Sequence, residues 1–239
     1  MGSSVSYQLQ DGVATIVMDD GKVNALSSEM LASIGEALDQ SVADDAAVVL
    51  TGRPGVFSGG FDLKVLTAGG PDAARMLEDG FALALRLLEH PAPVVIASNG
   101  HTIAMGVFLL LSGDYRIGID GPYRIVANEV TIGMTMPWAA IEICRQRLAP
   151  AHFHRVLSLA EVYTPAEGVA AGLLDRVVGA DDLLPTATTL ASALAGLDRR
   201  AHAATKLRAR ESALRSIRDG LENDREIFRH LAAARPAAT

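Results

Sequence analysis

Two glycine-bearing loops stand out in the sequence because each follows a short apolar stretch. The first spans residues 56–63 (VFSGGFDL), and the second spans residues 98–106 (SNGHTIAMG). Glycine lets backbone amides approach a ligand closely and adopts positive φ without strain. Amides at the start of a helix lack a helical partner and lie at the positive end of its dipole. Two such amides aimed at one point would stabilise an oxyanion; the alternative is that both loops are simple tight turns.

The elements that must position these loops alternate between strands and helices up to about residue 178. The pattern predicts a hairpin of strands 5–10 and 13–18 joined at Asp11-Gly12, and further strands at 47–50, 94–97, 115–119, 123–126 and 173–178. It predicts helices from Ser27 or Ser28 to Val42, from Pro71 towards His90, from Met105 to Leu111, after Pro137, and from Thr164 to Gly172.

From Asp181 onwards the pattern is helical only. The chain is therefore expected to form an α/β core, residues 1–180, followed by a C-terminal helical region, residues 181–239. The last residues, 234–239, are expected to be frayed.

Composition excludes several function classes. The 239 residues are 49% hydrophobic and carry a formal charge of −7, whereas a nucleic-acid binder presents a basic face. Cys144 is the only cysteine, which fits a reducing compartment. The first residues lack the basic and apolar regions of a signal peptide. The apolar run 103–111 is far shorter than the roughly 20 residues that span a bilayer. We expect a cytoplasmic protein that binds neither nucleic acid nor membrane.

Five segments, in their order and spacing, resemble the crotonase (enoyl-CoA hydratase/isomerase) superfamily. They are KVNAL (22–26), VLTGRPGVFSGGFDLK (49–64), PAPVVIASNGHTIAMG (91–106), the aspartate of LLLSGDYRIG, and ANEVTIG (127–133). TPAEGVAAGLLDRVV (164–178) is similar to a later segment of the family. The likeness covers residues 5–235. Each motif by itself is unspecific, but five in order are specific.

The resemblance implies a crotonase-like spiral of ββα units whose C-terminal helices help form homotrimers or hexamers. It implies an acyl-CoA substrate and no metal or cofactor beyond the coenzyme A of that substrate. The thioester carbonyl would lie in an oxyanion hole made by the backbone amides of Phe61 and Met105. The resemblance further implies substrate contacts, in which we include Lys22, Asn24, Gly60, Lys64, Gly106 and Phe108.

The acid–base residues decide the reaction. Hydratases of the family hold one water between two glutamates, and the matching positions here are Phe108 and Glu129. Phenylalanine cannot move a proton. A single base suffices to take a proton from the α-carbon of the thioester and return it to the γ-carbon, and the family's Δ3,Δ2-enoyl-CoA isomerases keep only the second glutamate. Glu129 therefore favours double-bond isomerisation over hydration.

Alternatives remain open at this point. Glu142 or His101 is a candidate to replace the missing acid, although a surface or structural role explains either. Bulky Met105 and Phe108 would narrow the acyl pocket. Hydration of 2-enoyl-CoA, another thioester chemistry, or a non-catalytic acyl-CoA-binding paralogue are the competing functions. His152 and His154 diverge on a helix and are rejected as metal ligands.

Overall fold

The computed structural model describes residues 4–233, so the expectation for residues 234–239 lies outside the described residues. A six-stranded sheet forms its centre, in the order β1-β2-β4-β7-β9-β11. These strands are β1 (Val5–Gln10), β2 (Val13–Met18), β4 (Ala47–Thr51), β7 (Val94–Ser98), β9 (Tyr115–Ile119) and β11 (Arg176–Val178). Only β1 and β2 pair antiparallel, and the others are parallel. Strands β4 and β7 are buried on both faces, which explains their unbroken apolar sequences.

A second, smaller sheet gives the chain its spiral path. After β4, β7 and β9 the chain adds one strand each to a parallel three-stranded sheet in the order β10-β8-β5. These strands are β5 (Gly55–Ser58), β8 (Gly100–Ile103) and β10 (Ile125–Val126), and a short pair is formed by β3 (Ala25–Leu26) and β6 (Gly60–Phe61). Helices follow each such pair of strands, so the expected succession of ββα units is present.

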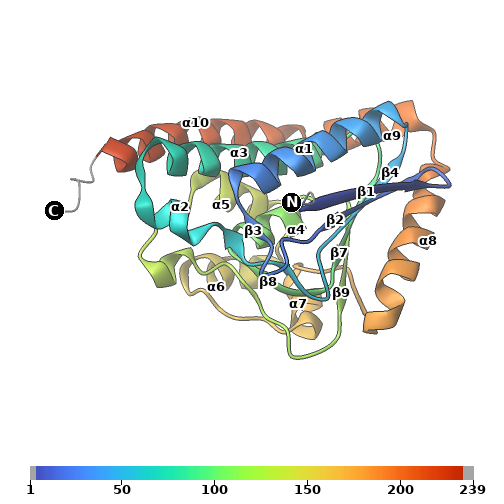
Figure 1. Ribbon diagram of the computed structural model, residues 1–239, viewed down its shortest axis with the longest axis horizontal. Helices are drawn as coiled ribbons and strands as arrows, with labels where there is room; N and C mark the ends of the chain where they lie inside the picture. The colour runs from blue at the N-terminus through green and yellow to red at the C-terminus, as the bar shows by residue number, and fades with distance from the viewer. Residues whose placement is uncertain (1–3, 234–239) are drawn as a thin grey trace.

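Helices cover both faces of the large sheet (Figure 1). On one face lie α1 (Ser28–Ala43), α3 (Gly70–Glu89), α4 (Met105–Leu111) and α10 (Glu211–Ala233), and on the other lies α8 (Leu183–Ala195). The remaining helices are α2 (Leu63–Ala68), η1 (Glu129–Ile132), α5 (Trp138–Arg145), α6 (Pro150–Ser158), α7 (Pro165–Ala171), η2 (Ala180–Asp182) and α9 (Arg199–Ala209). Within residues 4–233, no helix is long and apolar enough to cross a membrane.

Local signals in the sequence are confirmed where they are strongest. Asp11 and Gly12 both have positive φ at the hairpin turn, Ser27 caps α1, and the Thr164–Glu167 capping box is formed. The strand predicted at 173–178 is shorter, since the amides of Leu173 and Leu174 bond back to the carbonyl of Gly168 at the end of α7. Helix α2 was not predicted, and Val42 is exposed rather than buried.

Asp114, from the recognised aspartate motif, ties the C-terminal helices to the sheet. Its carboxylate accepts the amide of Val94 at 2.8 Å, the Nζ of Lys206 at 2.7 Å and an Nη of Arg210 at 2.8 Å. Burial lowers the pKa of Lys206 to about 8 although Asp114 opposes this shift. Lys206 lies within α9 and Arg210 directly after its last residue. The Asp114 carboxylate therefore joins the start of β7 to the C-terminal helical region.

We expect Asp114→Asn to lower the free energy of unfolding by about 3 kcal/mol, because removing one partner leaves a buried cation uncompensated. Denaturant unfolding at pH 7 measures this. Asp39→Asn, which breaks an exposed ion pair with Arg86, is the matched control and should cost less than about 1 kcal/mol. Equal losses in the two variants would contradict the role given to Asp114.

Candidate active site

A cavity of about 160 Å³ lies where the two glycine loops meet the segment that begins at Asn128. Its lining is mostly apolar and comprises Gly59, Phe61, Leu63, Leu66, Leu77, Phe81, Ile103, Ala104, Asn128, Glu129, Ile132, Met134 and Pro137. Among these described residues Glu129 is the sole titratable one. The cavity therefore offers one proton-transfer group within hydrocarbon walls.

Glycines allow the two loops to touch. A Cβ at Gly60 would lie 2.8 Å from the Cβ of Ala104 and 3.5 Å from the amide nitrogen of Met105. A Cβ at Gly106 would lie 3.0 Å from the Cβ and the carbonyl oxygen of Ser58. Gly60 also has φ +87°, which side chains rarely tolerate. The two glycines are thus required for the approach of the loops, which brings the backbone of Phe61 near that of Met105.

The Met105 amide starts helix α4. As the first helical residue it has no acceptor inside the helix. Within residues 4–233, the Met105 amide donates no hydrogen bond to an acceptor outside the helix either. Ala104, which precedes it, has φ 49° and ψ −123°, a strained conformation for a residue with a side chain. Such strain at the cavity wall fixes the direction of the amide and is typical of functional sites.

Asn24 holds the first loop through hydrogen bonds and does not line the cavity. It is fully buried, and its amide nitrogen donates to the carbonyls of Met18 at 2.9 Å and Phe57 at 3.2 Å. Its side-chain oxygen accepts the amide of Asp20 at 3.1 Å, and its main-chain carbonyl accepts the hydroxyl of Ser58 at 2.9 Å. The predicted substrate contact of the Asn24 side chain therefore has no support, because its hydrogen bonds are used within the protein. Its role is to hold the loop.

Glu129 begins the short helix η1, and only 7% of it is exposed. Burial raises the pKa of its carboxyl to about 7, while its own backbone amide opposes the change. Oε2 has no hydrogen-bond partner among the described residues. A carboxyl that is half ionised near neutral pH and has an oxygen without a partner can both accept and return a proton.

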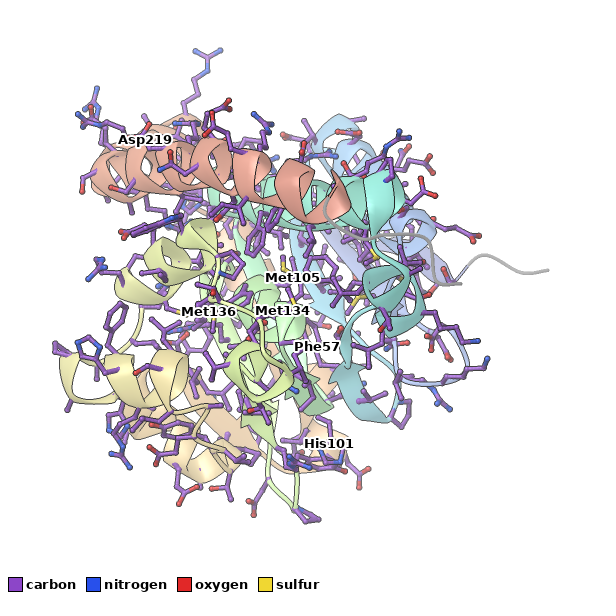
Figure 2. All side chains as sticks on the ribbon, turned by 90° about the vertical axis from the view of Figure 1, so that its left-hand side faces the viewer. Phe57, His101, Met105, Met134, Met136 and Asp219 are labelled. Atoms are coloured by element: carbon purple, nitrogen blue, oxygen red, sulfur yellow. The ribbon has the colours of Figure 1, made fainter. Side chains whose placement is uncertain are left out.

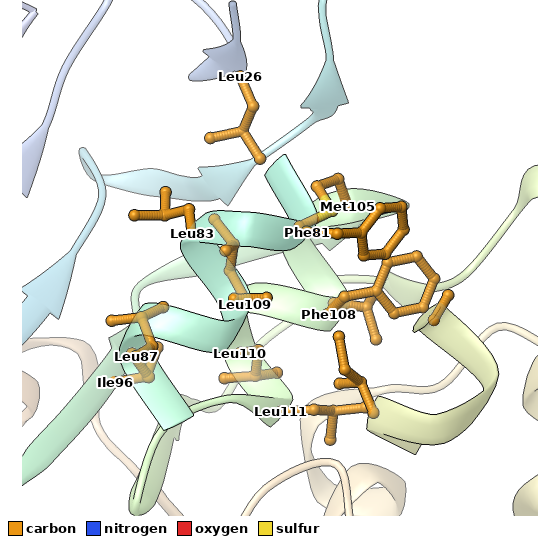
Figure 3. Packing of buried hydrophobic residues seen from close by; sticks show 14 of the residues in the cluster. Leu26, Phe81, Leu83, Leu87, Ile96, Met105, Phe108, Leu109, Leu110 and Leu111 are labelled. Carbon is orange, nitrogen blue, oxygen red and sulfur yellow. The ribbon is translucent and has the colours of Figure 1, made fainter. Parts of the chain in front are cut away.

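An aromatic wall faces the loops. The ring of Phe61 rests on α3 at Gly80, where a Cβ would come within 2.5 Å of it. It meets Phe81 edge to face at 6.4 Å between ring centroids. Phe108 lies behind Phe81, at 5.9 Å, within the core (Figure 3). Neither Phe108 nor the buried side chain of Met105 is among the residues that line the cavity, and Phe108 packs against Phe81, which does line it.

The other candidates lie elsewhere. His101 accepts the amide of Arg124 at 3.1 Å and stacks edge-on with Tyr123, well away from Met105 (Figure 2). Glu142 is paired with Arg145 at 3.1 Å on α5. Neither lines the cavity, so neither replaces the missing acid in this structure.

Two lysines predicted to contact coenzyme A are both exposed. Lys64 follows Leu63, a lining residue, in the first turn of α2, which Asp62 caps by accepting the Lys64 amide at 2.8 Å. Lys22 lies beside Arg53, which donates to its carbonyl at 2.8 Å.

Several residues that line the cavity were not predicted from the sequence, among them Leu77 and Phe81 of α3, Met134 and Pro137. On a helix the same apolar periodicity marks a side chain that faces a cavity and one that faces the core. No local signal distinguishes the two.

Comparison with known proteins places these features in a family. The sequence model described as "Enoyl-CoA hydratase/isomerase" matches residues 8–236. The crystal structure of enoyl-CoA hydratase EchA3 from Mycobacterium ulcerans has 46% sequence identity and a TM-score of 0.91, over 94% of this chain and 99% of the other. A Mycobacterium tuberculosis protein is described as an enoyl-CoA isomerase in one structure and as probable enoyl-CoA hydratase EchA3 in another. The first of these structures has 46% identity and a TM-score of 0.90, over 94% of this chain and 98% of the other.

Human mitochondrial enoyl-CoA delta isomerase 1 is 33% identical over 181 residues, which is 74% of this chain. The match spans 60% of the length of that relative.

Replacing Glu129 should stabilise the fold in a pH-dependent way. The folded protein tolerates the protonated carboxyl in the cavity wall but not the ionised one, so the pKa of Glu129 is raised to about 7. The stability that comes from holding the proton is complete below pH 4.5, the ordinary pKa of the group, and is lost as the pH rises through about 7. The difference between these values corresponds to about 3 kcal/mol, as an order of magnitude. Glu129→Gln should therefore exceed the wild type in free energy of unfolding by up to about 3 kcal/mol at pH 8 and by much less at pH 5.

Denaturant unfolding at both pH values measures the difference. Glu36→Gln, on the exposed face of α1, controls for the loss of one carboxylate. A constant difference between wild type and Glu129→Gln at the two pH values would rule out a desolvated Glu129.

Proposed function

The chain belongs to the enoyl-CoA hydratase/isomerase (crotonase) family, and we propose that it is an enoyl-CoA isomerase that moves a double bond with Glu129 as its single base. The observation that carries the proposal is the cavity lining, in which Glu129 is the sole titratable residue among those described. The substrate is a 3-enoyl thioester of coenzyme A.

The backbone of the two loops holds the thioester carbonyl. The amides of Phe61 and Met105 donate hydrogen bonds to the oxygen, which gains negative charge when the α-proton leaves. The close packing of the loops supports this arrangement: a Cβ at Gly60 would lie 3.5 Å from the Met105 nitrogen, and Phe61 and Ala104, the neighbours of Gly60 and Met105, both line the cavity. Such preorganised donors stabilise the charge that develops in the transition state.

Glu129 carries the proton. Its carboxylate takes a proton from the α-carbon, the electrons move into the thioester carbonyl, and a dienolate forms. The neutral carboxyl then returns the same proton to the γ-carbon, so that the double bond lies between the α- and β-carbons and Glu129 is again ionised. A pKa of about 7 suits both steps, because neither protonation state is strongly preferred near neutral pH.

Hydration of a 2-enoyl thioester is disfavoured because the cavity lining offers no second acid–base group among the residues that the structure describes. A water would have to be activated and oriented by a second group, and Phe108 lies behind Phe81 instead of supplying one. The relatives carry both the hydratase and the isomerase names, so similarity does not choose between the two reactions.

Binding of coenzyme A and assembly into oligomers are part of the same proposal. Lys22 and Lys64, both exposed, are assigned to the phosphates of coenzyme A. The protein acts as a cytoplasmic homotrimer or hexamer, for which light scattering of the purified protein gives the mass directly.

Paired assays with 3-enoyl-CoA and 2-enoyl-CoA thioesters test the reaction. We expect isomerisation of the former, little hydration of the latter, and a kcat/KM for isomerisation that rises with pH to a plateau above about 7, since the ionised Glu129 is the base. Glu129→Gln should lower kcat by at least about 100-fold, the usual contribution of a general base.

Glu142→Gln is the matched control, because this carboxylate lies outside the cavity. Efficient hydration by the wild type would overturn the isomerase assignment. Bound acyl-CoA without any turnover, unchanged by Glu129→Gln, would instead identify a non-catalytic binder.

A further inference from the structure

The C-terminal helix α10 packs on α3, which lines the cavity, and on α5, which begins directly after the lining residue Pro137 (Figure 1). Leu77 and Phe81 of α3 line one wall of the cavity, and Pro137, directly before α5, lines another. No side chain of α10 lines the cavity among the described residues. Any influence of α10 on the site is therefore exerted through these two helices.

Within the broad contact between α10 and α5, two residues of α10 one helical turn apart meet the start of α5. A Cβ at Gly220 would lie 2.9 Å from the amide nitrogen of Ala139 and 3.0 Å from the carbonyl carbon of Trp138. Gly220 therefore lets the backbones of the two helices meet. Asp224 lies four residues further on the same face of α10.

Asp224 caps the N-terminus of α5 from a distant part of the chain. The residue before this helix is Pro137, whose side chain cannot accept a hydrogen bond from the first helical amides. The carboxylate of Asp224 accepts both of them, with 2.9 Å from the Trp138 nitrogen to one oxygen and 2.9 Å from the Ala139 nitrogen to the other. Only 1% of Asp224 is exposed. Burial of a carboxylate is costly, so its place here is tied to these two amides.

The same helix packs its apolar residues on α3 and adds two partly exposed ion pairs to it. Arg225, next to Asp224, reaches Glu78 at 3.4 Å, and Arg218 pairs with Glu89. Glu78 is the neighbour of Leu77 in the cavity wall. Helix α10 thus spans the two walls, attached to one by Arg225 and to the other by Asp224.

We propose that Gly220 and Asp224 form a latch through which α10 sets the position of the Pro137 wall of the acyl cavity. Asp224 is then a positioning residue for the reaction at Glu129, and the inference rests on the proposed function only for the identity of the ligand. The latch acts on the binding of the acyl chain, since it touches no reacting atom.

Asp224→Asn is the first test. The near-isosteric amide keeps one acceptor and loses the other, so the dissociation constant of a saturated acyl-CoA and the KM of the 3-enoyl-CoA should rise about tenfold. A tenfold change corresponds to about 1.4 kcal/mol, the size expected for one lost charge-assisted hydrogen bond. The kcat and its pH profile should change little. Asp219→Asn, exposed on the same helix (Figure 2), is the matched control and should leave all of these values unchanged.

Trp138 gives a direct readout of the latch. It is the only tryptophan of the chain, and its backbone amide is one of the two that Asp224 accepts. The emission spectrum of the folded protein should change in Asp224→Asn and stay the same in Asp219→Asn. A wild-type spectrum together with a wild-type dissociation constant in Asp224→Asn would overturn the proposal.

Gly220→Ala tests the latch without removing the carboxylate. Alanine is the better helix former, so a merely local role for Gly220 predicts an equally active and more stable protein. The latch predicts the opposite for the ligand, because the new Cβ pushes α10 away from Ala139 and weakens acyl-CoA binding. Tighter or unchanged binding in Gly220→Ala would contradict it.

The two proposals fail separately. If Glu129→Gln retains turnover, the single-base reaction is wrong, while the binding and tryptophan measurements on Asp224 still test the latch. If turnover follows Glu129 but binding ignores Asp224 and Gly220, the reaction stands and the latch is wrong.

Discussion

The contact between two backbone loops underlies everything else in this structure. Gly60 lies against Ala104 and the Met105 amide, and Gly106 lies against Ser58. A side chain at either glycine would separate the loops and the two amides that they carry. The parallel pairing of β5 with β8 sets the two loops side by side. Asn24 holds the first loop through hydrogen bonds to the carbonyls of Val56 and Phe57, its first two residues. The strained Ala104 persists because this surrounding structure leaves it no alternative.

Desolvation links the chemistry of Glu129 to the stability of the fold. The walls that exclude water raise the pKa of its carboxyl to about 7, where it can serve as base and then as acid. The same burial makes its ionised form costly at neutral pH. Phe81, held in place by Phe108 and Phe61, supplies much of this apolar surface. A reactive carboxylate and a less stable protein are consequences of one environment.

Buried charges hold the helices around this centre. Asp114 joins Lys206 and Arg210 to the start of β7, and Asp224 joins α10 to the start of α5. Arg147 donates to the carbonyl of Gly113, just beyond the end of α4, where a cation is favourable. These links explain how helices far along the chain become part of the support of a site whose reacting groups all precede residue 130.

Local signals predicted the alternation of strands and helices and the two glycine loops, because glycine, turn and capping signals act over a few residues. The hairpin at Asp11-Gly12 and the capping box at Thr164 depend on such local chemistry. The spiral of ββα units and the single carboxylate of the site were implied by the resemblance of the ordered motifs to the family. Tertiary structure alone decided which apolar residues face the cavity. Phe81 and Phe108 look alike in sequence, yet one lines the cavity and the other lies behind it. It also turned Asn24 from a candidate ligand contact into a buried support, and joined Asp224 to amides 86 and 85 residues away, since packing between distant segments leaves no local pattern.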